Sequence, residues 1–117
     1  MLTLLQALLI AASAITLTTA DNGRAIVVDT GSSVVLRLKA NRTTGYQWVL
    51  AEKSRQCATV VRDDYRSGHS GLMGAGGTRV LTLRFDRPGK CAVRLSYLRP
   101  WQANAPADSF AVSVNVR

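Results

Sequence analysis

The stretch that decides the fold is Cys91-Ala-Val-Arg-Leu-Ser-Tyr97, together with Phe110-Ala-Val-Ser-Val-Asn-Val116 near the end of the chain. In both stretches large apolar residues alternate with small or polar ones. This alternation has the period of a β-strand, because successive side chains of a strand point to opposite sides. The two stretches therefore predict half-buried strands whose apolar faces cover a common core.

The same alternation extends to the rest of the chain. Further strands are expected at 25–28, 34–39, 46–51, 57–61 and 80–85, with turn residues between them. No stretch after residue 20 sustains helical spacing. This pattern predicts an all-β fold, an Ig-like antiparallel β-sandwich of about seven or eight strands. Because there is no internal repeat and no linker, we expect one domain over residues 21–117.

Residues 1–20 differ in composition from the rest of the chain. They carry no charged side chain and lead from an apolar stretch into small residues, as a signal peptide does. Thr18-Thr-Ala20 offers a cleavage site before Asp21, and Ala12-Ser-Ala14 offers a second one. A membrane anchor is the alternative, but the apolar run is short for a span and contains Thr and Ser. We expect a signal peptide over residues 1–20 and a secreted or periplasmic protein.

The two cysteines, Cys57 and Cys91, both follow this leader. In an oxidising compartment an even number favours one disulfide, which would stabilise the domain by about 3 kcal/mol or more. Two separate buried thiols are the alternative, and the residues alone leave both open. A catalytic cysteine is disfavoured, because the single histidine, His69, stands in a Gly/Ser-rich loop without a cue for pairing it with a thiolate.

The chain is strongly basic, with a formal net charge of +8. Such a charge attracts anionic partners, but the basic residues are spread out and form no basic tail, which disfavours nucleic-acid binding. The sequence contains no cluster with metal-ligand spacing. Asp63 and Asp64 are adjacent, so in a strand they would face opposite sides and could not flank one substrate bond. The residues predict neither an enzyme nor a metal or cofactor site.

Three connections between strands, at residues 41–46, 67–77 and 99–106, are longer or more unusual than a turn requires. The first is rich in threonine, the second in glycine, and the third contains tryptophan and arginine, which are enriched among interface hot spots. Taken singly, each has an ordinary alternative as a turn, a flexible loop or a tryptophan packed over the sandwich end. The residues expected to contact a partner are Asn41, Arg42, Thr43, Thr44, Gly45, Tyr46, Gly74, Ala75, Gly76, Gly77, Arg99, Pro100 and Trp101.

Taken together and in this order, these motifs resemble the signature loops of the chagasin-type inhibitors of cysteine peptidases. That family has Asn-Pro-Thr-Thr-Gly-Tyr/Phe, Gly-x-Gly-Gly and Arg-Pro-Trp, and the likeness covers essentially the whole domain after the leader. The resemblance implies an Ig-like sandwich and reversible, competitive, non-covalent inhibition of papain-like cysteine proteases. A monomer without a cofactor is expected.

The resemblance also implies a task for each loop. Residues 43–45 would enter at the catalytic Cys and His of the protease. Residues 74–77 would run along the substrate cleft through backbone contacts. Arg99 and Trp101 would press on the far side, with Trp101 meeting an aromatic surface there.

Arg42 departs from the family pattern, which has proline at this position. Proline fixes φ and lowers the entropy lost on docking. Arg42 is therefore expected either to weaken binding or to add a contact with an acidic rim of the cleft. The cysteine pair is a second departure, and a bridge there would stiffen the scaffold.

A second hypothesis is a basic binding module without inhibitory activity. It would dock an anionic surface or polymer through Arg37, Lys39, Arg84 and Arg94, which the strand alternation exposes. Its affinity would fall steeply with salt concentration.

Overall fold

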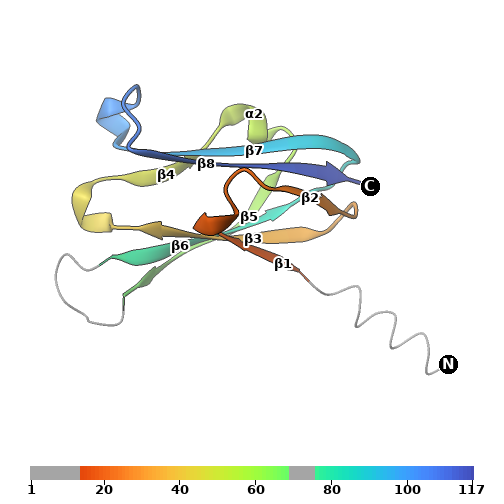
Figure 1. The fold of residues 1–117 in the computed structure, drawn as a ribbon, viewed down its shortest axis with the longest axis horizontal. Helices are drawn as coiled ribbons and strands as arrows, with labels where there is room; N and C mark the ends of the chain where they lie inside the picture. The colour runs from red at the N-terminus through yellow and green to blue at the C-terminus, as the bar shows by residue number, and fades with distance from the viewer. Residues whose placement is uncertain (1–13, 69–75) are drawn as a thin grey trace.

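The computed structural model describes residues 14–68 and 76–117, which form two packed sheets of four strands each (Figure 1). The first sheet has the strand order β1-β3-β6-β5 and the second has β2-β8-β7-β4. The strands are β1 (Ile15–Thr18), β2 (Ala25–Val28), β3 (Ser33–Ala40), β4 (Gln47–Leu50), β5 (Thr59–Ser67), β6 (Gly77–Arg84), β7 (Gly89–Leu98) and β8 (Asp108–Val116). The predicted all-β, Ig-like sandwich is confirmed.

The core lies between the sheets and is built from the strand phases that the sequence predicted. Each inward phase contributes alternate residues, and the outward phases are mostly polar or small, with Val27 and Val49 among the exposed exceptions. The buried residues include Val34, Leu36, Leu38, Trp48, Leu50, Leu81, Leu83, Phe85, Cys91, Val93, Leu95, Phe110, Val112, Val114 and Val116. Strand alternation alone therefore identified most of the core.

Strand β1 lies within the segment that the sequence assigned to the leader. It pairs in parallel with β3, so that Ile15 is opposite Val34 and Leu17 is opposite Leu36. Leu17 is completely buried and belongs to the core. Residues 15–18 are thus an edge strand of the first sheet, and the domain boundary after residue 20 stays a prediction.

A short helix, α2 (Glu52–Arg55), follows β4, although the sequence gave no helical signal there. Its Ser54 is fully buried; the hydroxyl donates to the carbonyl of Ala92 at 2.8 Å and accepts from the amide of Arg94 at 3.0 Å. Both of these groups belong to β7, so one serine satisfies the strand edge just beyond the end of β4. Among the described residues, no helix is long and apolar enough to cross a membrane.

The disulfide favoured by the sequence is present. Cys57 and Cys91 are bonded, with a distance of 5.8 Å between their Cα atoms. The bridge joins the segment after α2 to the beginning of β7. The loop at residues 99–106 follows the other end of this ten-residue strand, so the disulfide lies far from that loop.

We predict that replacing both cysteines with alanine lowers the free energy of unfolding by about 3 kcal/mol, because the unfolded chain loses a cross-link. Urea denaturation of the double variant and of the parent protein measures the difference. Trp101, beyond the far end of β7, should keep its fluorescence. An unchanged urea midpoint, or a midpoint of the parent that does not move with reductant, would contradict the prediction.

Candidate functional site

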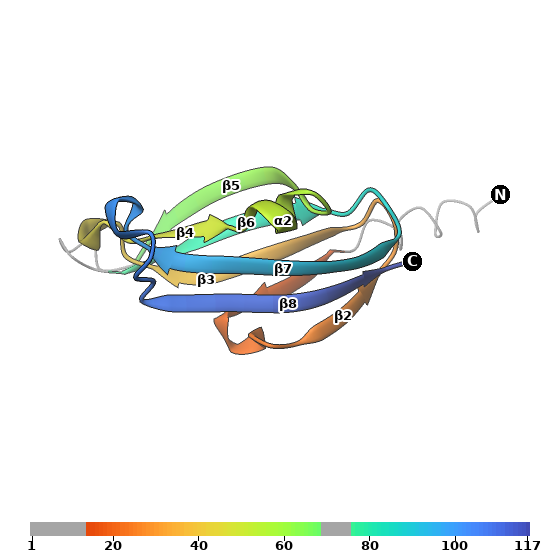
Figure 2. The same cartoon turned by 90° about the horizontal axis from the view of Figure 1, so that it is seen from above.

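The loop between β3 and β4 and the loop between β7 and β8 lie together at one end of the sandwich, where β5 also ends and β6 begins (Figures 1 and 2). Two antiparallel pairings bring the glycine segment to this end. Gly77 is opposite Ala40 on one side and Ser67 on the other. All three predicted segments therefore start from the same end, although Gly74 and Ala75 lie outside the described residues.

The first loop is held by its own hydrogen bonds around a 3₁₀ turn at Arg42–Thr44. The Asn41 side chain accepts from the Thr43 amide at 3.1 Å and from the Thr43 hydroxyl at 2.7 Å. The Thr44 hydroxyl donates to the Asn41 carbonyl at 2.9 Å. Gly45 ends the turn with a φ of 81°, which strongly favours glycine. Because both hydroxyl protons are used within the loop, the exposed threonines present methyl groups and acceptor lone pairs to a partner.

The third loop is bonded directly to the first. Arg99 donates from Nε to the carbonyl of Thr44 at 3.0 Å, and its guanidinium carbon lies 4.5 Å from the centre of the Tyr46 ring. Trp101 lies against Gly45: a Cβ added to this glycine would be 2.6 Å from Cη2 of the indole. The indole is nevertheless 69% exposed, so it packs against Gly45 while most of its surface remains accessible to a partner.

Aromatic residues form the base under these two loops. Tyr97 stacks on Tyr46 with ring centres 5.3 Å apart and lies 4.9 Å from the ring of Trp48. The Tyr97 hydroxyl accepts from the amide of Asn41 at 2.9 Å, and the Trp48 indole donates to the carbonyl of Lys39 at 3.0 Å. These contacts connect both ends of the first loop to the second sheet.

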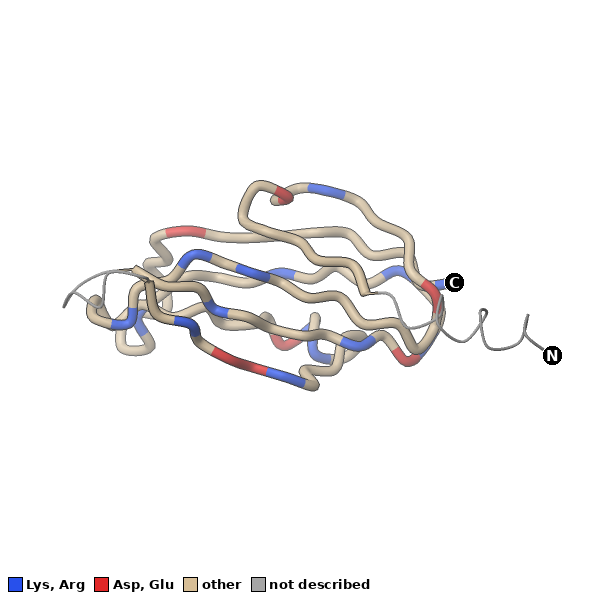
Figure 3. The backbone as a smooth tube through the Cα atoms, turned by 90° about the horizontal axis from the view of Figure 1, so that it is seen from below, with Lys and Arg blue, Asp and Glu red and all other residues tan. Residues whose placement is uncertain are grey.

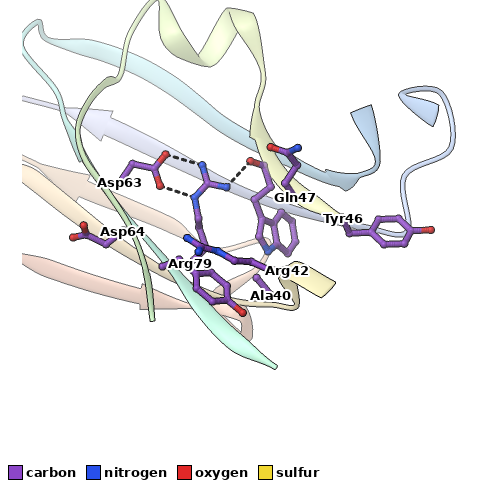
Figure 4. A pocket seen from close by; sticks show the side chains of 9 residues that line it. Ala40, Arg42, Tyr46, Gln47, Asp63, Asp64 and Arg79 are labelled. Carbon is purple, nitrogen blue, oxygen red and sulfur yellow. Dashed lines mark hydrogen bonds and ion pairs between the residues drawn. The ribbon is translucent and has the colours of Figure 1, made fainter. Parts of the chain in front are cut away.

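Arg79 closes the side of the sandwich between β4 and β5 (Figure 4). Its side chain is on the same side of β6 as those of Leu81 and Leu83, near the beginning of the strand and thus at the loop end of the sandwich. Its guanidinium makes two bonds to Asp63 on β5, of 2.6 and 2.7 Å, and donates to the carbonyl of Trp48 on β4 at 3.2 Å. One side chain thus links the two sheets directly beneath the first loop.

Arg42 folds back from the first loop onto β5 (Figure 4). Its guanidinium carbon lies 4.0 Å from the centre of the Tyr65 ring, which is the geometry of a cation–π contact. At an exposed site such a contact contributes about 0.5–1 kcal/mol. The residue that replaces the family's proline therefore ties the loop to the first sheet.

The two described glycines of the second segment differ in what surrounds them. Gly76 is exposed, and a Cβ there would be 3.7 Å from the carbonyl oxygen of Ala40, an ordinary contact. Gly77 has no such space, because a Cβ would collide with the carbonyl of Arg66 and with the ring of Tyr65. Gly76 can accept a side chain, whereas Gly77 is required by packing.

The basic residues do not form one patch. Figure 3 shows Lys and Arg distributed along the molecule. Arg37 and Lys39 are on the outer face of the first sheet, whereas Arg94 is on the outer face of the second. Arg84 pairs with Asp86 at 2.7 Å, and its hydrogen bond lowers the pKa of that carboxyl below its usual value. A single docking surface made of these four cations does not fit this arrangement.

Asp63 and Asp64 bind different partners, Arg79 and Arg62. Within residues 14–68 and 76–117, no three His, Cys, Asp or Glu side chains gather in a way that could hold a metal ion.

Sequence reasoning missed the residues that support the loops from below. Arg79 and Tyr65 are opposite each other in the β5–β6 hairpin, and Asp63 is the diagonal neighbour of Arg79. This group could have been found only from the register of the hairpin, because each residue taken alone reads as an ordinary polar strand position.

Comparisons with known proteins agree with this geometry. The family model of the chagasin family peptidase inhibitors matches residues 27–116. Chagasin of Trypanosoma cruzi is 35% identical over 88 residues, which are 72% of this chain and 80% of that protein. Amoebiasin-1 of Entamoeba histolytica is 32% identical over 103 residues, 86% of this chain and 98% of that protein. The crystal structure of the cysteine protease inhibitor EhICP2 from Entamoeba histolytica shares the fold, with a TM-score of 0.79 at 24% identity over 89% of this chain and 96% of that one.

Gly45→Ala should cost more than the strain of its positive φ. That strain alone is about 1–2 kcal/mol, and the new methyl group must also displace the Trp101 indole. The matched control is Gly31→Ala, where φ is 87° and no atom lies within 4 Å of the added Cβ. We expect urea denaturation to show a loss in both variants and a change in tryptophan emission in Gly45→Ala alone. An equal emission spectrum in the two variants would contradict the contact.

The Arg42–Tyr65 contact should appear as a coupling energy. Arg42→Gln, Tyr65→Leu and the double variant form a thermodynamic cycle, for which we expect a coupling of about 0.5–1 kcal/mol in the free energy of unfolding. Arg42→Lys keeps the charge and should retain part of it. Additive single effects would show that the guanidinium does not stabilise the loop through this ring.

Proposed function

The chain belongs to the chagasin family of peptidase inhibitors, and we propose that it blocks papain-like cysteine proteases by placing the loops at one end of the sandwich in their active-site cleft. The observation that supports this most directly is that Thr43, Thr44 and Trp101 are exposed together on two loops that contact each other. Arg99 is hydrogen-bonded to the carbonyl of Thr44, and the Trp101 indole packs against Gly45. Exposed residues on a rigid support lose little entropy on binding, so more of the contact energy becomes affinity.

The tip at residues 43–45 is the part that would face the catalytic cysteine and histidine. It is a turn closed by internal hydrogen bonds rather than an extended peptide, so it does not offer a bond in the geometry of a substrate. The methyl groups and glycine make it narrow enough for a cleft. The inhibitor would thus exclude substrate without being cleaved, and inhibition would be reversible and competitive.

Trp101 would supply the largest apolar contact. A tryptophan that is 69% exposed in the free protein can bury most of its ring on binding. Arg99 has a different task in this proposal, since its Nε–H is bonded to the first loop. It positions the tip, and its remaining N–H groups can reach the rim of the cleft.

Gly76 is the described part of the second segment that is open to a partner. Its exposed backbone groups can pair with a protease chain in the manner of an added strand, and its lack of a side chain leaves room for that approach. Gly74 and Ala75 are proposed to continue this contact.

We also propose that the inhibitor acts outside the cytosol. A disulfide between Cys57 and Cys91 is typical of proteins in oxidising compartments. The apolar leader at residues 1–20 is expected to act as a signal peptide that directs export.

The proposal predicts that the folded protein inhibits papain at sub-micromolar concentration and that Trp101→Ala weakens inhibition about ten- to a hundredfold, as loss of an aromatic hot spot does. The variant should unfold at nearly the parent's urea concentration, because the ring is largely exposed. The inhibition constant is measured by titrating papain with each protein.

Val27→Ala is the matched control, since Val27 is 50% exposed and lies on β2, away from the loops. It should leave inhibition unchanged. Full papain activity under a large molar excess of folded protein would overturn the proposed function, and equal inhibition by the parent and Trp101→Ala would remove the indole from the mechanism.

A further inference from the structure

We propose that the export leader is removed between Ala14 and Ile15, so that β1 remains in the exported protein. The two small-residue sites in the sequence lie on either side of this strand. The structure distinguishes them by what each cut would remove.

A cut after Ala20 would remove a buried part of the sandwich. Leu17, which is fully buried, packs in the core that also contains Leu36, its partner on β3. Without β1 the core would lose a leucine, and β3 would become an unpaired edge with newly exposed apolar side chains.

The same cut would also open the turn that leads from β1 to β2. Ala20 lies within the 3₁₀ turn Thr19–Asp21. The amide of Thr18 donates to the Asp21 carboxylate at 2.8 Å, and this bond, more than the pairing with Arg24, holds the pKa of that carboxyl below its usual value. The Thr19 hydroxyl accepts from the amide of Lys39 on β3 at 3.4 Å. Residues 18–21 are therefore bonded to one another and to the first sheet.

A cut after Ala14 removes nothing that the described fold uses. Ala14 is exposed and precedes the strand, and Ile15 is 40% exposed, so a new charged amine at Ile15 would remain in water. The residues next to this bond also fit the small-x-small pattern more closely. Ala12 and Ala14 give the small-x-small pattern with alanine at both positions, whereas the other site has threonine at the first of them.

Secretion of the full chain by a bacterial host tests the proposal directly. The exported protein, with a sequence pI of about 10.5, is recovered by cation exchange and its first residues are read by N-terminal sequencing. We expect Ile15 as the first residue. A protein that begins at Asp21, or one that is exported without cleavage, overturns the proposal.

Paired substitutions separate the two sites. Ala14→Leu should block processing because a large residue replaces the one next to the cut bond, and Ala20→Leu should leave the N-terminus at Ile15. Both alanines are exposed, so neither change disturbs the core. The opposite pattern would place the cut after Ala20.

Leu17→Ala gives an independent readout on the secreted protein. If Leu17 remains, its truncation creates a cavity and lowers the urea midpoint, whereas Thr16→Ala, at an exposed neighbour, should not. If the leader ends at residue 20, both precursors yield the same mature protein and identical midpoints. This readout does not use a protease, so it can fail while inhibition of papain stands, and the reverse also holds.

Discussion

The position of the loops depends on Trp48, which both sheets hold at once. Its backbone belongs to β4 of the second sheet and pairs with Tyr97, while its indole donates to the carbonyl of Lys39 on β3 of the first. Its carbonyl accepts from Arg79, whose carboxylate partner lies on β5. Two sheets that touch only through apolar side chains can shift relative to each other, but directional bonds at one end fix their offset. The first loop crosses between the sheets at this point, so its position follows from that offset.

Arginine and proline at position 42 are two physical solutions to one problem. Arg42 is the first residue of a 3₁₀ turn whose preceding residue, Asn41, caps it, and proline is well suited to this position. Proline would stabilise the protein by about 0.4–1 kcal/mol, because it reduces the conformational entropy of the unfolded chain. The contact of Arg42 with Tyr65 stabilises the folded state by about 0.5–1 kcal/mol. Because these amounts are similar, the contact of Arg42 with Tyr65 can offset the stability that proline would supply at this position. The expectation that Arg42 would either weaken binding or reach an acidic rim left out this contact within the molecule.

The alternation of apolar residues predicted which face of a strand is buried. It did not predict contacts between side chains of different strands, because these depend on how the strands are aligned. Alternation located the inward phases of β3, β4, β6, β7 and β8, since one buried face dictates which residues are apolar. It could not identify Arg79, which occupies an inward phase as a charged residue and is stabilised there by Asp63 from another strand. Composition also does not separate the strand Ile15–Thr18 from the expected leader, because a short apolar edge strand and the end of a leader look alike. The loops were found from their unusual residues and from the resemblance, whereas their mutual bonds, such as Arg99 to Thr44, required coordinates.

The internal hydrogen bonds of the first loop constrain how a protein of this kind can discriminate among proteases. The hydroxyl protons of Thr43 and Thr44 are bonded to Asn41, so the tip presents methyl groups, oxygen lone pairs and backbone. In the proposed binding mode, these groups would meet features that thiol-protease clefts share, and they would carry little information about a particular enzyme. In the proposed binding mode, selectivity would therefore come from the surrounding residues, where the exposed Trp101 would meet surfaces that differ between proteases. Net charge acts mainly on the association rate and on the rejection of like-charged partners, so the charge of +8 would favour the approach of a protease with an acidic surface.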